Sequence, residues 1–184
     1  HKDLTHIPFV TIDGENSKDF DDAVFAEVNN EKIKILVAIA DVSFFVKKGD
    51  PIDVEAKKRG NSFYFPDRVI PMLPEILSNN ICSLIPNQIR ASLVCEIILQ
   101  NTKIIKYKFH RAKILSKARL TYKEVDEIHK DNRKNEISKL VDNLFKALET
   151  LKKISERRGK IEFKVKEYEV NFTNDKEFKF EEKE

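Results

Sequence analysis

An acidic stretch near the N-terminus constrains the fold of this chain more than any other feature. Residues 13–22 contain four aspartates, Asp13, Asp19, Asp21 and Asp22, and apolar residues flank the stretch on both sides. Carboxylates this close together repel one another unless cations lie between them. Because Asp22 leads directly into an apolar run, we expect the acidic loop to meet the hydrophobic core at this point.

The residues of this stretch leave two interpretations open. Asp, Asn, Gly and Ser form turns, so an acidic loop at a strand end is often only solvated. The second interpretation is a cation site, and the arrangement favours it: with period-2 alternation, Asp19 and Asp21 point to one side while Phe20 packs on the other. A cluster of oxygen ligands suits Mg²⁺ or Mn²⁺ rather than zinc. A calcium loop of the EF-hand type fits poorly, because the residues after Asp19 lack its alternating ligands.

Composition limits the class of protein. The chain has 184 residues, of which 41% are hydrophobic and 35% charged; this indicates a soluble globular domain with a core. No apolar run approaches the roughly 20 residues of a membrane helix, so we expect no membrane partner. The formal net charge is only +3, so any phosphate binding has to come from local basic clusters or bound metal.

The two cysteines and the N-terminus suggest where the protein acts. Cys82 and Cys95 are too far apart for a CxxC pair, and no histidine spacing accompanies them. This predicts two buried free thiols in a reducing compartment, hence a cytoplasmic protein. Residues 1–4 do not form a signal peptide, and they read as an internal cut in a longer protein.

Hydrophobic periodicity predicts an α+β fold: a mixed β-sheet with at least three helices, one of them long. Apolar runs predict strands at residues 24–28, 33–40, 93–99, 104–109 and 161–172, the last with a bulge. Capping signals and apolar spacing predict helices that start at Pro51, Thr121 and near Ile137. We expect the charged residues 173–184 to form a frayed tail.

Three further features each have a structural and a functional interpretation. Asp41 follows a buried strand, so it is either a functional carboxylate or a satisfied cap. Residues 111–119 form a basic patch, which is either a solvated strand face or a phosphate contact. The aromatic residues of the loop 63–74 either plug the core or stack on nucleobases; Tyr64 suits stacking best, since its hydroxyl tolerates a wet site.

Taken together, several motifs resemble the catalytic domain (RNB domain) of the RNase II/RNase R exoribonucleases, and they are closer to RNase R. These motifs are the acidic run and residues 35–43, 64–74, 77–79, 82–84 and 118–122. The resemblance extends from about Asp3 to Phe163, so the domain is expected at residues 1–172. It implies processive 3′→5′ hydrolysis of single-stranded RNA with Mg²⁺ (or Mn²⁺), which releases nucleoside 5′-monophosphates.

The resemblance also implies roles for individual residues. Asp13, Asp19, Asp21 and Asp22 match metal-binding positions, and Asp21 and Asp22 are the expected catalytic residues, with Asp21 the most important. Two cations held by such carboxylates would supply the activated water and stabilise the leaving oxygen of phosphodiester hydrolysis.

Tyr64 and Phe163 resemble the family's RNA-stacking aromatics. The local sequence before Phe163 departs from the family pattern, which has Asp before Phe. The family's arginine-rich motif lies downstream of this chain, so we expect these residues to carry the metal-binding half of a site and to degrade RNA poorly alone. The alternatives are a non-catalytic RNA-binding or regulatory module of the same fold and a phosphoesterase for small substrates.

Overall fold

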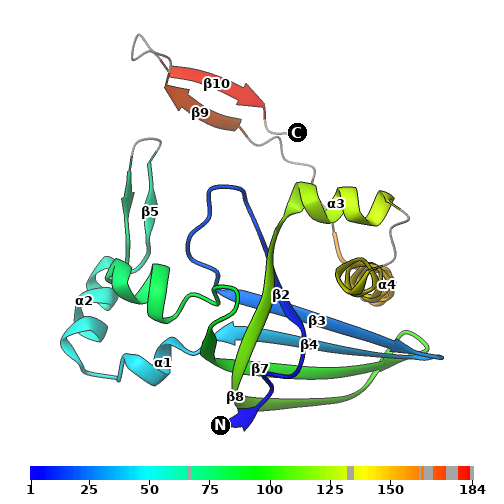
Figure 1. Ribbon diagram of the computed structural model, residues 1–184. Helices are drawn as coiled ribbons and strands as arrows, with labels where there is room; N and C mark the ends of the chain where they lie inside the picture. Colours follow the sequence, from blue (N-terminus) through cyan, green and yellow to red (C-terminus); the bar gives the residue numbers. More distant parts are fainter. Residues whose placement is uncertain (66–67, 132–134, 162, 164–167, 173–177, 183–184) are drawn as a thin grey trace.

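The computed structural model describes residues 1–65, 68–131, 135–161, 163, 168–172 and 178–182. The fold is α+β, as predicted, with a mixed sheet between two groups of helices (Figure 1). The strands are β1 (Lys2–Asp3), β2 (Phe9–Asp13), β3 (Asp22–Asn29), β4 (Lys32–Ala40), β5 (Phe63–Tyr64), β6 (Val69–Ile70), β7 (Ile89–Gln100), β8 (Lys103–Thr121), β9 (Tyr168–Phe172) and β10 (Phe178–Glu182). The helices are α1 (Val42–Phe45), α2 (Pro51–Arg59), the π-helical turn η1 (Leu77–Ile81), α3 (Tyr122–Lys130) and α4 (Glu136–Arg157).

The long strand β8 joins the two ends of the main sheet. Its first part pairs antiparallel with β7, from Lys103 to Leu115, and its last part pairs parallel with β2, from Ser116 to Thr121. The strand order β8-β2-β3-β4-β7 therefore closes on itself, with the short β1 added parallel to β8. This closure places the C-terminal end of β8 beside the end of β2, where the acidic loop begins.

Local sequence signals explain the helix boundaries. Thr121 and Asn135 both form capping boxes, at the starts of α3 and α4 respectively, and each satisfies free N–H groups of a first turn. Gly60 ends α2 with a left-handed φ of 72°. Helix α2 starts at Pro51 as predicted, with Asp50 as its N-cap residue, but the Asp50 carboxylate does not cap the helix and instead accepts a hydrogen bond from Lys47 N at 3.0 Å.

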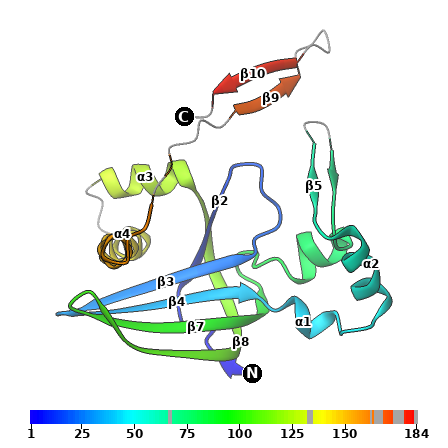
Figure 2. The same ribbon diagram turned by 180° about the vertical axis from the view of Figure 1, so that it is seen from behind.

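The core lies on both faces of β4. Leu36 and Ala38 belong to the main cluster inside the ring of strands, whereas Ile35 faces α4 and packs near Ala147. Helix α4 packs next to β3 and α3 lies beside it, whereas α1, α2 and the β5–β6 hairpin lie beyond the end of β4 (Figures 1 and 2). Near the end of β4, Ile39 is 46% exposed although it belongs to an apolar run, whereas its neighbours Ala38 and Ala40 are buried.

The apolar stripe of α4 is only partly buried. Leu140 and Val141 are buried, as a core stripe requires, but Leu148 is 44% and Leu151 is 37% exposed. None of the helices in the described part of the chain has the length and apolar character that a membrane crossing needs.

The C-terminal segment forms a separate hairpin in which β10 pairs antiparallel with β9. The predicted strand at residues 161–172 is confirmed only from Tyr168 onward; Ile161 and Phe163 are not in a strand, and residues 162 and 164–167 lie outside the described residues. Within the predicted tail, Phe178–Glu182 pair with β9, and the prediction that residues 173–184 are frayed stays a prediction. The domain boundary at residue 172 stays a prediction.

Both cysteines are free thiols, but only Cys82 is buried, whereas Cys95 is half-buried. Desolvation raises the pKa of the Cys82 thiol, and the negative charges of Asp21 and Asp41 raise it further. The prediction of two buried thiols is therefore correct for Cys82 alone. The cytoplasmic location stays a prediction.

Candidate active site

The acidic loop connects two neighbouring strands. Asp13 is the last residue of β2 and Asp22 is the first residue of β3, so residues 14–21 form the loop between them. Phe20 is buried in the main core, while Asp19 is half-buried and Asp21 is exposed. This confirms the predicted alternation, in which the aromatic side chain anchors the loop and the flanking carboxylates remain outside the core.

The buried hydroxyl group of Ser83 holds the end of this loop that leads into β3. Ser83 Oγ accepts a hydrogen bond from Phe20 N at 2.9 Å and donates one to Lys18 O at 3.1 Å. Leu84 N also donates to Phe20 O at 2.9 Å, and the Ser83 side chain is fully buried. The backbone on both sides of Asp19 is therefore fixed by residues that follow η1.

Arg119, on strand β8, holds the start of the loop, directly after β2. Arg119 Nη2 donates to Gly14 O and Glu15 O, each at 2.7 Å. Its guanidinium carbon also lies 5.8 Å from the centre of the Phe20 ring, in a cation–π arrangement. Neither Ser83 nor Arg119 was predicted from the sequence to hold the acidic loop, although Ser83 lies in the motif segment 82–84 and Arg119 in the segment 118–122.

The aspartates lie close enough to perturb one another electrostatically. Desolvation raises the pKa of Asp13, and the charges of Asp22, Asp19 and Asp21 raise it further while Arg119 opposes them. Desolvation also raises the pKa of Asp21, followed by repulsion from Asp19 and Asp22. The pKa of Asp22 is raised by desolvation. All four carboxylates belong to the loop between β2 and β3 or to the strand ends that it joins.

The donor chemistry of this region suits a hard divalent cation. The buried Asp13 Oδ2 has no hydrogen-bond partner among the described residues, and carboxylate oxygens are the ligands that Mg²⁺ and Mn²⁺ prefer. Within the described part of the chain, no three acidic, histidine or cysteine side chains are already arranged to hold one ion. The assignment of Asp13, Asp19, Asp21 and Asp22 as ligands of a shared ion therefore stays a prediction.

The β5–β6 hairpin brings an exposed aromatic ring to the acidic loop. Tyr64 Oη donates a hydrogen bond to Asp19 Oδ2 at 3.3 Å across 45 residues of sequence. Tyr64 is 68% exposed, so its side chain is accessible to a base. Partial desolvation and the nearby Asp19 charge raise the pKa of Tyr64, so its hydroxyl remains a proton donor.

The second predicted stacking residue is not brought to this region by any contact among the described residues. Phe163 is 81% exposed, and its neighbours 162 and 164–167 lie outside the described part of the chain. Its predicted role in RNA binding stays a prediction.

The basic patch at residues 111–119 is largely engaged by the protein itself. Arg111 Nε lies 3.3 Å from Asp41 Oδ2, and Arg111 Nη2 donates to Ser43 Oγ at 2.8 Å. Ser43 Oγ in turn donates to Asp41 Oδ1 at 2.6 Å. Asp41 is thus a buried carboxylate with partners at the start of α1, which supports its structural interpretation. Lys113 pairs with Asp3 at 2.8 Å, so neither a solvated face nor a phosphate contact describes the patch as a whole.

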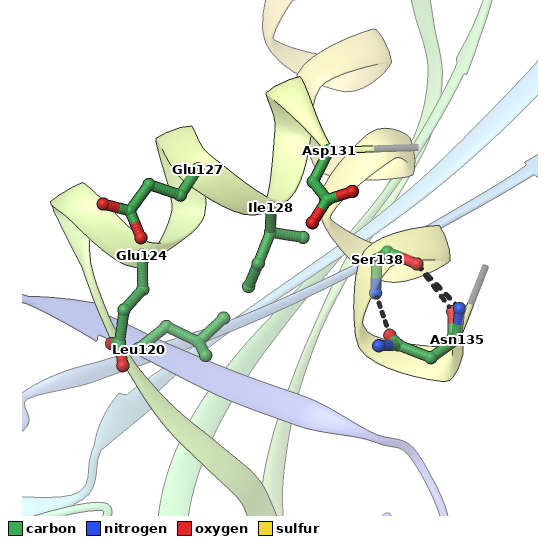
Figure 3. Close-up of a pocket in the computed structure, with 7 residues that line it drawn as sticks. All are labelled: Leu120, Glu124, Glu127, Ile128, Asp131, Asn135 and Ser138. Atoms are coloured by element: carbon green, nitrogen blue, oxygen red, sulfur yellow. Dashed lines mark hydrogen bonds between the residues drawn. The ribbon is translucent and has the colours of Figure 1, made fainter. Parts of the chain in front are cut away.

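A pocket of about 260 Å³ between α3 and α4 is separate from the acidic loop (Figure 3). Leu120 and Ile128 line it together with the acidic residues Glu124, Glu127 and Asp131. Glu124 already accepts hydrogen bonds in the capping box of α3. None of the four aspartates of the acidic stretch lines this pocket.

Comparisons with known proteins agree with the fold. A family model described as RNB domain matches residues 1–184. Ribonuclease R of Vibrio cholerae is 44% identical over 177 residues, which cover 92% of this chain and 22% of that protein. Ribonuclease R of Escherichia coli has the same identity and the same coverage of both chains.

A solved structure supports the same relationship. Mycoplasma genitalium RNase R, determined in complex with ribose methylated single-stranded RNA, superposes with a TM-score of 0.85 at 36% identity. The match covers 98% of this chain and 29% of that one. The chain spans about a fifth of the length of the curated relatives it matches, 22% in each case. The predicted resemblance, closer to RNase R, is confirmed, and the chain belongs to the RNB domain family.

Proposed function

We propose that the protein is a 3′→5′ exoribonuclease that hydrolyses single-stranded RNA and releases nucleoside 5′-monophosphates. The observation that carries this proposal is the contact between Tyr64 and Asp19, with Oη and Oδ2 3.3 Å apart. It joins an exposed aromatic ring to the cluster of carboxylates. An aromatic platform holds a base without selecting its identity, which a small phosphate ester would not require.

The proposed roles follow from the positions of the side chains. Tyr64 stacks on a base near the 3′ end of the RNA, and Asp13, Asp19, Asp21 and Asp22 hold Mg²⁺ or Mn²⁺. When bound, the divalent cation lowers the pKa of a water and stabilises negative charge on the phosphate. Asp21 and Asp22 would orient a water for attack on phosphorus. A bond forms between the water oxygen and phosphorus while the P–O3′ bond breaks, and the water gives up a proton to solvent. The O3′ atom of the shortened chain takes up a proton and becomes its 3′-hydroxyl, and the water oxygen stays on the 5′-phosphate of the released mononucleotide.

Labelled RNA tests the reaction and its direction. The protein that carries this chain is incubated with single-stranded RNA labelled at the 5′ end, and then with RNA labelled at the 3′ end. We expect a ladder of shortening 5′-labelled products, and immediate release of labelled mononucleotide from the 3′-labelled RNA, both dependent on Mg²⁺ or Mn²⁺.

Two substitutions complete this experiment. Asp21→Asn should abolish both signals, whereas Asp126→Asn should leave them intact, because Asp126 is an exposed α3 residue paired with Lys130. RNA that is bound but not shortened would support the alternative, a non-catalytic RNA-binding module. Internal fragments from either label would contradict an exonuclease.

A further inference from the structure

We infer that Arg119 is a positioning residue that sets the geometry of the acidic loop, an inference that rests on the proposed function. Register between β2 and β8 places Arg119 opposite Thr11, two residues before Asp13. From there its Nη2 atom donates to Gly14 O and Glu15 O, 2.7 Å away in each case. These are the carbonyl groups of the two residues that follow Asp13.

The two bonds fix the turn by which the chain leaves β2. Gly14 O also accepts a hydrogen bond from Ser17 N at 3.2 Å, so Arg119 and this turn share one acceptor. Ser83 fixes the later part of the loop through its hydrogen bonds with Lys18 O and Phe20 N. The distance between Asp13 and the three later aspartates is therefore set by two anchors from distant parts of the chain.

The chemistry of arginine suits this role better than that of lysine. A planar guanidinium can direct two N–H groups from one nitrogen to neighbouring carbonyls while its face lies over an aromatic ring. Arg119 does both, since its guanidinium carbon is 5.8 Å from the Phe20 ring centre. Arg119 is half-buried, its Nε atom is buried without a hydrogen-bond partner among the described residues, and its positive charge offsets part of the repulsion among the nearby carboxylates.

The test compares Arg119→Ala and Arg119→Lys with the unmodified protein. Residues that orient metal ligands typically change metal affinity by about 10- to 100-fold when they are replaced. We expect Arg119→Ala to weaken binding of Mn²⁺ alone, in the absence of RNA, by about that factor. Because a misplacement of about 1 Å can cost about 100-fold in rate, kcat should fall strongly while KM for RNA stays nearly unchanged. Arg119→Lys keeps the positive charge but not the planar guanidinium group, so its Mn²⁺ affinity and kcat should lie between those of Arg119→Ala and the unmodified protein.

The matched control is Lys106→Ala, which removes an exposed positive charge from the same strand, far along β8 from the loop. It should leave Mn²⁺ binding and kcat unchanged. Amide hydrogen exchange at Ser17 should be faster in Arg119→Ala, because the Gly14 carbonyl that accepts the Ser17 N–H is no longer held by Arg119.

Unchanged Mn²⁺ affinity and unchanged kcat in Arg119→Ala would overturn the inference. A rise in KM with kcat intact would also overturn it, because Arg119 would then contact RNA directly. If the alanine variant does not fold, Arg119→Lys decides by the same two measurements. Asp21→Asn is measured in parallel: full activity of that variant refutes the proposed function, whereas Mn²⁺ binding still tests Arg119 independently.

Discussion

Replacing Ser83 with alanine tests whether one buried hydroxyl holds the acidic loop. The substitution removes two hydrogen bonds and leaves the buried N–H group of Phe20 without a partner. An unpaired buried donor costs about 1–3 kcal/mol, so we expect the free energy of unfolding to fall by about 2 kcal/mol. In a domain of this size, 1 kcal/mol corresponds to about 2–4 °C, so Tm should fall by about 4–8 °C.

Urea denaturation of the metal-free protein provides the measurement, with an unchanged slope m showing that only stability has altered. Ser92→Ala is the matched control, because Ser92 is also fully buried but its hydroxyl has no hydrogen-bond partner in the described part of the chain. Burial of an unpaired hydroxyl is unfavourable, so this variant should be as stable as the parent or more so. Equal losses in the two variants, or a loss below about 0.5 kcal/mol for Ser83→Ala, would refute the reasoning.

Three further predictions concern the same region. Desolvation of the carboxylate and the charges of Asp19 and Asp22 raise the pKa of Asp21 above its unfolded value, so its ionised form destabilises the fold at neutral pH. Asp21→Asn should therefore raise the metal-free Tm at pH 7. The difference in Tm should shrink as the pH falls toward about 4, where Asp21 becomes protonated in both states. Tyr64→Ala should raise KM for a short oligoribonucleotide by about tenfold, whereas Tyr64→Phe, which keeps the ring, should change KM little. An equal rise of KM in both variants would show that the hydroxyl, and not the ring, binds the RNA. Arg111→Ala should lower the free energy of unfolding in urea by about 1–3 kcal/mol, because it removes the positive charge that pairs with the buried Asp41 carboxylate and leaves only the Ser43 hydroxyl as its side-chain partner. Addition of Asp41→Asn should recover part of the loss, and strictly additive losses would contradict this.

The elements predicted correctly are those whose signals are local. Strands β3 and β4 follow from the apolar runs at residues 24–28 and 33–40. They pair as a hairpin, and Asn30 in the turn between them adopts the positive φ of 51° that such a turn needs. The capping box at Thr121 follows from four consecutive residues. The alternation around Phe20 likewise predicted which side chain enters the core.

The errors arise where a distant segment decides the outcome. Strand β8 was predicted at residues 104–109 but extends to Thr121, because its second half pairs with β2 and not with its hairpin partner. Ile39 resembles a core residue in sequence but remains exposed, since no described element covers its row of the sheet. In the same way, Arg111 is bound by Asp41 on another element, which charge density alone does not reveal.

By itself, the sequence determined that four aspartates meet a hydrophobic core and that strands and capped helices surround them, because spacing along the chain encodes these properties. Only the tertiary structure decided which residues hold and accompany those aspartates. Tyr64 contacts the loop across 45 residues, Ser83 across 63, and Arg119 across 105. These contacts depend on the parallel pairing of β2 with β8 and on the packing of Phe20, and such long-range pairings leave no periodic signal in the residues that make them.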